Sequence, residues 1–119
     1  MTVLAVMPGE KPIKMELEGT LKSMQEFVGG TIQAIYPFAD PVAIICNDEG
    51  KLMGLEYNRT LRNENGAICD ILCGPFFVCG LGTEDFESLP EKLMETYYKR
   101  FERPERFVMI GGNLVVVRV

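Results

Sequence analysis

The stretch VAIICN, residues 42–47, constrains the fold more than any other part of the chain. A half-exposed strand alternates polar and apolar residues, because successive side chains point to opposite faces of a sheet. Here five consecutive residues are apolar and only Asn47 is polar, so both faces of an extended segment would be apolar. We therefore expect a strand in a central position of a sheet, with neighbours on both sides.

Other short apolar or alternating runs predict the remaining strands. The segment IKMELEG alternates strictly and predicts a half-exposed strand, which we expect to pair with residues 2–7 through the Pro8-Gly9 turn. Residues 51–55 are expected to return from the DEG turn as a hairpin partner of residues 42–47, with Gly50 in a left-handed conformation. The other predicted strands are residues 31–36, 67–74 and 76–80, and a terminal hairpin within residues 106–119.

Two segments have the signals of helices. Thr20–Val28 places apolar residues on one face and is followed by Gly29-Gly30, a typical C-terminal stop. Ser88 and Glu91 have the spacing of a capping box, so a second helix is expected to begin at Ser88 and to end before Pro104. We predict a single α+β domain over residues 1–119, with a mostly antiparallel sheet of five to seven strands and two packed helices.

Composition narrows the classes of function. The formal net charge is −5 and no basic run occurs, which argues against a nucleic-acid-binding protein. The apolar start of the chain is broken by Pro8-Gly9 and is too short for a signal peptide or a membrane span. We expect a cytoplasmic protein that does not interact with a membrane.

The chain has four cysteines and no histidine. No two cysteines have Cys-x-x-Cys spacing, and all four lie among apolar residues, so we expect buried, reduced thiols and neither a metal site nor a cofactor. The lack of histidine excludes nucleophilic catalysis of the Ser-His and Cys-His types.

The best candidate for a ligand site is the segment around Asn58, Arg59 and Arg62, which has the character of a loop between two hairpins. A guanidinium group suits phosphate or carboxylate, and functional residues favour loops on a rigid sheet. We add Asn47 and Asp70 to this candidate ligand-binding set.

A purely structural interpretation of the same residues stays open. Asn58 could bond nearby backbone amides in a turn. Arg59 could lie over Tyr57, or pair with Asp70 or Glu64 and so fix the connection between two strands.

Three stretches of the chain resemble one family. They are FVGGTIQAIYP, VAIICNDEGKLMGLEYNR and GAICDILCGPFFVCG, and the resemblance to the family called domain of unknown function 3846 extends over about residues 2–101. The resemblance implies a cytoplasmic accessory protein of phages or mobile elements from Gram-positive bacteria, and it supplies no catalytic residues. Pro75 and the hairpin after Pro104 are departures from the family or additions to it.

Three classes of function follow. The first is an accessory protein without catalysis that binds a host protein or a small anionic ligand through Asn58, Arg59 and Arg62. The alternatives are a small hydrolase or transferase that uses Asp70 with Arg59, and a nucleic-acid-binding protein. The apolar segment LVVVRV at the end of the chain predicts a homodimer or larger oligomer if it forms an uncovered edge strand, and no such assembly if it lies inside the sheet.

Overall fold

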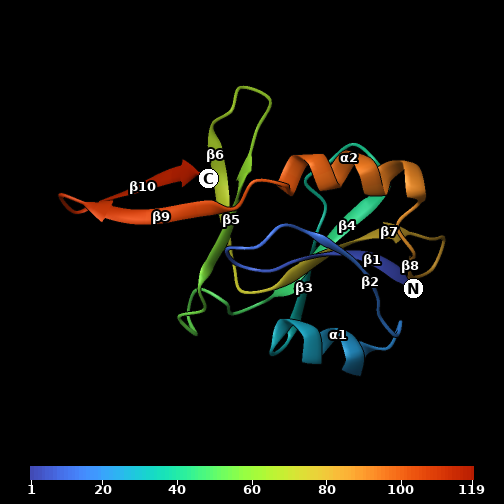
Figure 1. Ribbon diagram of the computed structural model, residues 1–119. Coiled ribbons are helices and arrows are strands. Elements are labelled where there is room, and N and C mark those ends of the chain that lie inside the picture. The colour runs from blue at the N-terminus through green and yellow to red at the C-terminus, as the bar shows by residue number, and fades with distance from the viewer.

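A computed structural model describes all residues of the protein, 1–119, and shows one six-stranded sheet, two separate two-stranded sheets and two helices (Figure 1). All strand pairs are antiparallel. The main sheet has the order β2-β1-β7-β4-β3, and the short β8 pairs with β7. Its strands are β1 (Thr2–Val6), β2 (Ile13–Glu16), β3 (Ile32–Ile35), β4 (Val42–Asn47), β7 (Phe76–Leu81) and β8 (Phe86–Glu87). The predicted α+β class with a mostly antiparallel sheet is confirmed.

The segment VAIICN forms β4, an interior strand as predicted. Every residue of β4 is buried, and the strand pairs with β7 on one side and β3 on the other. The hairpin between β1 and β2 is also confirmed, with Val3 opposite Met15.

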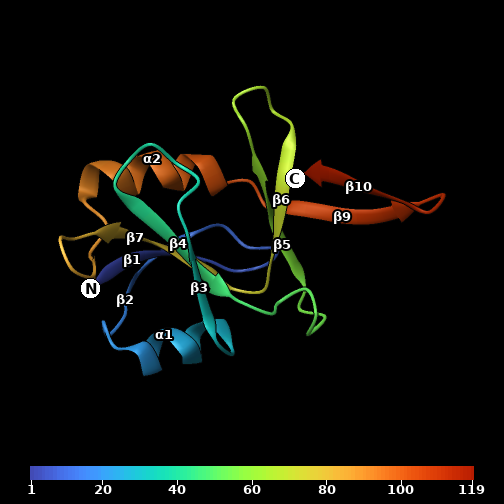
Figure 2. The ribbon, with the colours of Figure 1, turned by 180° about the vertical axis from the view of Figure 1, so that it is seen from behind.

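Alternate residues of these interior strands face two different helices. Ile45 and Phe77 lie in a cluster with Met24 of α1 (Leu21–Val28), whereas Ile44 and Phe76 lie in a larger cluster with α2 (Glu91–Phe101). The helices therefore cover opposite faces of the main sheet, as the view from behind also shows (Figure 2). Neither helix combines the length and the apolar character that crossing a membrane requires.

The second sheet consists of β5 (Tyr57–Arg62) and β6 (Ile68–Cys73). The predicted Asn65-Gly66 turn joins the two strands, and Gly66 has a φ of 80°, a conformation that favours glycine. Leu61 and Leu72 reach into the cluster that packs on α2. This hairpin stands at one end of the main sheet, beside the end of α2 (Figure 1).

The third sheet is the terminal hairpin, which we call the arm: β9 (Glu105–Ile110) and β10 (Asn113–Arg118). Gly111 and Gly112 have φ values of 56° and 81°, so the turn between the strands is of the two-residue type that matches strand twist. The predicted hairpin is confirmed, and it projects away from the body of the protein (Figure 1).

The predicted hairpin between residues 42–47 and 51–55 is wrong. Residues 48–54 form consecutive turns, in which the amide of Met53 donates to the carbonyl of Glu49. Gly50 does not have a positive φ, whereas Gly54 does, at 70°. Gly50 is needed for space instead, because a Cβ there would lie 2.9 Å from the carbonyl oxygen of Cys73.

The predicted start of the second helix is also wrong. The helix begins at Glu91, three residues later than expected, after Pro90 in an extended conformation. The hydroxyl of Ser88 does not cap the helix, because it accepts a hydrogen bond from the amide of Thr2 at 2.8 Å. The predicted limits of α1 are confirmed: Thr20 caps its start, and Gly29 ends it in a left-handed conformation.

Candidate functional site

Asn58 lies inside the protein, on β5, and not in a loop as predicted. Its side chain is fully buried, and its amide nitrogen donates to the carbonyl oxygens of Val6 and Gly74, each at 2.9 Å. Val6 ends β1, and Gly74 leads from β6 into β7. Asn58 therefore ties the second sheet to two strands of the main sheet.

Arg59 is also fully buried on β5, which corrects the prediction that it lies in a loop. Its guanidinium group makes five hydrogen bonds. Two go to the carbonyl oxygen of Phe101, two to the carbonyl and side-chain oxygens of Asn58, and one to the carbonyl oxygen of Glu10. Phe101 is the last residue of α2, so Arg59 places a cation against a carbonyl that the helix itself leaves free.

The partner of Arg59 is neither Asp70 nor Glu64, the two carboxylates that the sequence suggested. No carboxylate lies within ion-pair distance of its guanidinium. Burial lowers the pKa of Arg59, and the nearby charge of Glu105 acts in the opposite direction. Glu105 is buried too, and accepts hydrogen bonds from the amide and hydroxyl of Thr60 at 3.0 and 2.8 Å.

Asp70 lies at a half-exposed position of β6, opposite Leu61, and bonds with Lys51 at 2.5 Å. Partial burial opposes ionisation of this carboxyl, but hydrogen bonds from Lys51 and from the amide of Ile71 outweigh it and lower the pKa of Asp70. Asp70 is bonded to Lys51 and makes no contact with the buried Arg59, so Asp70 and Arg59 do not form a catalytic pair.

Asn47 is buried at the end of β4 and organises the turns that follow. Its amide nitrogen donates to the carbonyl of Val28, and its oxygen accepts from the amide of Glu49 at 2.8 Å. The five residues predicted to bind a ligand are therefore not brought to one place. Asn47 and Asp70 line one hollow of about 330 Å³ together with Lys51, whereas Asn58 and Arg59 are buried. Arg62 lines different hollows, next to other cations.

The cysteines do not form a reactive cluster. All four are free, and burial raises the pKa of Cys46 to about 11 and that of Cys79 to about 12. Burial also raises the pKa of Cys73. Cys69 is exposed on β6, which corrects the expectation that all four thiols are buried. No three cysteine, aspartate or glutamate side chains gather in the manner of a metal site.

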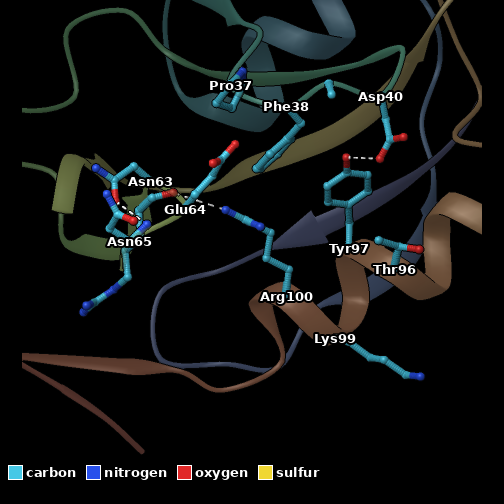
Figure 3. Close-up of a pocket in the computed structure, with 12 residues that line it drawn as sticks. Pro37, Phe38, Asp40, Asn63, Glu64, Asn65, Thr96, Tyr97, Lys99 and Arg100 are labelled. Carbon is cyan, nitrogen blue, oxygen red and sulfur yellow. Dashed lines mark hydrogen bonds between the residues drawn. The ribbon is translucent and has the colours of Figure 1, made fainter. Parts of the chain in front are cut away.

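A groove of about 1040 Å³ lies between three segments that are distant in the sequence. Its walls are the β3–β4 connection at residues 37–40, the β5–β6 turn at residues 62–65 and the last turns of α2 at residues 96–100. Figure 3 shows Arg100 reaching across the groove towards the β5–β6 turn, and Tyr97 facing Asp40. The Tyr97 hydroxyl donates to Asp40 at 2.6 Å, and burial with this hydrogen bond raises the pKa of Tyr97.

A second, smaller hollow of about 420 Å³ adjoins the groove, and Arg100 lines both. We call it the arginine hollow. Its basic lining residues are Arg62 of β5, Lys99 and Arg100 of α2, and Arg118 of β10. Its acidic lining residues are Glu64 and Glu105, so the lining has four cations and two anions.

None of the three arginines of this hollow has a carboxylate partner, and two of them, Arg62 and Arg100, are held by other groups. The guanidinium of Arg100 lies 4.5 Å from the centre of the Phe38 ring and donates to the carbonyl of Arg62 at 3.3 Å. That of Arg62 donates to the hydroxyl of Thr60 and to the carbonyl of Gly66, each at 3.1 Å. None of the three lies within ion-pair distance of an acidic side chain.

Lys99 contributes less to this cluster than the arginines do. Its amine pairs with Glu95 at 3.4 Å, one turn earlier on the exposed face of α2. Figure 3 shows the side chain pointing away from the groove. The sequence pointed to Arg62 but not to its neighbours, because Arg100 and Arg118 are distant in the chain and only the fold brings them together.

Comparison with known proteins gives one match. The family model described as domain of unknown function (DUF3846) matches residues 1–102, which include the main sheet, both helices and the second sheet but not the arm. No curated protein and no solved structure matches the chain. Because the match extends over most of the sequence, the chain belongs to the domain of unknown function 3846 family.

Proposed function

We propose that the protein is a binding protein without catalysis, and that the arginine hollow takes a small anionic ligand. The observation that carries this proposal is the gathering of Arg62, Arg100 and Arg118 around one hollow, with no carboxylate paired to any of them, in a chain whose net charge is −5. The lining has four cations and two anions, so a net positive charge remains, and a bound anion reduces the repulsion between the cations.

The chemistry of these side chains favours phosphate or carboxylate groups. A guanidinium presents planar, paired donors that match two oxygens of such a group, and it stays charged at all physiological pH values. The hollow of about 420 Å³ suits a small anionic group, and the adjoining groove of about 1040 Å³ leaves room for the rest of a larger molecule. Glu64, which lines both, offers an acceptor for a donor group of the ligand.

The alternative of a hydrolase or transferase has less support. It requires Asp70 and Arg59 to act together, but Asp70 bonds with Lys51 and Arg59 is buried against backbone carbonyls. We expect the accessory role to lie in the cytoplasm of a Gram-positive host of a phage or mobile element, which is what the family resemblance implies. Binding of a host protein or of nucleic acid would use other surfaces.

The test is a titration of the protein with inorganic phosphate, pyrophosphate and citrate, followed by amide chemical shifts in NMR. We expect saturable shifts at residues 62–66, 99–101 and 118 with at least one of these probes. Arg118→Ala should weaken binding about 10- to 100-fold, the size expected for loss of a charge-assisted hydrogen bond.

Arg106→Ala is the matched control, because Arg106 lies on the same arm, is exposed and does not line the arginine hollow. Its affinity for the probe should equal that of the wild type. The proposal fails if none of the probes shifts these residues, or if Arg106→Ala and Arg118→Ala weaken binding equally.

A further inference from the structure

The arm carries an apolar surface that the body of the protein does not cover. Six of its large apolar side chains are between 37 and 64% exposed: Val108, Met109, Ile110, Val115, Val117 and the terminal Val119. Opposite residues of the two strands share a face and successive residues alternate, so Val108, Ile110, Val115 and Val117 lie on one face of the arm and Met109 on the other. Single exposed apolar residues are ordinary, but a group on one face is typical of an interaction site.

The backbone of β10 has one unpaired edge. The amide of Val119 donates to the carbonyl of Pro104, the residue just before β9, so this amide points towards β9. Because amides alternate in direction along an antiparallel strand, those of Leu114, Val116 and Arg118 point away from β9. No third strand joins this sheet, so these three amides and the matching carbonyls lie along a free edge.

We infer that this edge of β10 pairs antiparallel with β10 of a second copy of the chain. A pairing centred on Val116 places each outward amide opposite an outward carbonyl of the other copy. Val116 then faces Val116 of the other copy, Leu114 faces Arg118, and Val115 faces Val117. The two arms form one four-stranded sheet with the order β9-β10-β10-β9.

The side chains favour a copy of the same strand as the partner. Arg118 is the only charged residue of β10, and in this register it lies opposite Leu114, so no like charges face each other across the interface. Every other cross-strand pair along the centre is apolar on apolar. A two-fold axis through Val116 satisfies all of these pairings at once, as self-complementary interfaces require.

The position of the arm agrees with this role. The family match ends at residue 102, before β9 begins, so the arm is an addition to a body that contains both helices and the main sheet. In this register the five residues from Leu114 to Arg118 pair over about 17 Å, a short interface compared with those of permanent dimers. The dimer should therefore be weak and reversible, and dependent on concentration.

Sedimentation equilibrium from about 10 μM to about 1 mM protein tests the pairing. We expect the average mass to rise from 13.3 kDa towards twice that value as concentration increases. Val116→Pro should hold the mass at that of a monomer, because proline has no amide hydrogen and Val116 lies at the centre of the pairing. Val116→Ala removes two methyl groups but keeps the amide, and it should still dimerise.

Amide hydrogen exchange distinguishes loss of the pairing between two copies of β10 from unfolding of the arm itself. In Val116→Pro the inner amides of Val115 and Val117 should stay protected, which shows that the hairpin is intact. In the wild type, the amides of Leu114, Val116 and Arg118 should gain protection at high concentration. A monomer at every concentration overturns the inference, and so does a dimer that persists in Val116→Pro with the inner amides protected.

Discussion

The protein uses arginine in two opposite ways within one small region. Arg59 is fully buried and makes five hydrogen bonds to groups of the protein itself. Arg62, Arg100 and Arg118 lie around an open hollow. The guanidinium groups of Arg62 and Arg100 contact a ring, a hydroxyl and carbonyls rather than acids. Arg59 and Arg62 are three positions apart on the same strand, so the difference comes from their surroundings and not from the residue type.

The comparison separates a structural cation from an available one. The buried guanidinium has donors bonded on every nitrogen, and those bonds join β5 to the end of α2 and to the loop at Glu10. No donor is left over for a ligand, and no path leads to it from solvent. The cations around the hollow keep donors free and face solvent, which is the arrangement that a bound anion needs.

The largest expected effect is on Arg59. Arg59→Ala should lower the free energy of unfolding by about 3–5 kcal/mol, because it removes a buried charged group and leaves the carbonyls of Phe101 and Glu10 without a donor. Denaturant melts measure this change. Arg59→Lys should recover little of it, since one amine does not reproduce a fork that spans several acceptors.

Arg106→Ala is the control for this change, because Arg106 is exposed and makes no side-chain hydrogen bond or ion pair. It should change stability by less than about 0.5 kcal/mol. If Arg59→Ala lowers the free energy of unfolding no more than Arg106→Ala does, the hydrogen bonds of Arg59 do not stabilise the fold.

Asn58 should show the next largest effect. Asn58→Ala leaves the buried carbonyls of Val6 and Gly74 without a donor, and each unsatisfied group costs about 1–3 kcal/mol. We expect a loss of about 2–4 kcal/mol in the same melts. Asn65→Ala, at an exposed position of the β5–β6 turn, is the matched control and should cost much less; equal losses would contradict the assignment.

Much of the fold could be predicted because local patterns specify it. The apolar run of β4, the alternation of β2 and the Gly-Gly turn of the arm each report a nearby physical constraint. The errors occurred where a distant group overrides the local signal. Ser88 matches a helix cap in sequence, but its hydroxyl is taken by the amide of Thr2, and the helix begins after Pro90.

The candidate site was harder to predict for the same reason. The acceptors of Arg59 come from Glu10 and Phe101, 49 and 42 positions away, and no local pattern near β5 indicates them. Polarity alone made Asn58 and Arg59 resemble a loop, although they lie on a buried strand. The arginine hollow draws its residues from β5, α2 and β10, so only the topology brings them together.

A smaller effect is expected at the pair of Asp70 and Lys51, which is exposed. Asp70→Ala should cost at most about 1 kcal/mol, as is usual for exposed ion pairs. Pairing lowers the pKa of Asp70 from 3.8 and raises that of Lys51 from 10.5. The contribution should therefore be present between those two values, and be lost as pH falls through the lowered pKa or rises through the raised one.

A double-mutant cycle of Arg59→Ala with Asp70→Ala checks that the hydrogen bonds of Arg59 are independent of the ion pair of Asp70. The two losses should add within about 0.5 kcal/mol, because the residues share no hydrogen-bond partner. Strong coupling would show that Asp70 belongs to the buried network. In a second cycle, Asp70→Ala and Lys51→Ala should couple to each other.

The smallest expected effect on stability is at Arg118, and its sign is the sharpest test of the comparison. The side chain of Arg118 makes no hydrogen bond or ion pair, and it shares its hollow with Arg62 and Arg100. Arg118→Ala should leave the free energy of unfolding unchanged within about 0.5 kcal/mol, or raise it slightly, because the remaining cations repel one another less. Added salt screens that repulsion, so any gain should shrink as ionic strength rises. Melts at low and high salt measure both quantities, with Arg106→Ala as the control. A clear loss of stability in Arg118→Ala would mean that this arginine, like Arg59, is held by the protein itself and is not available to a ligand.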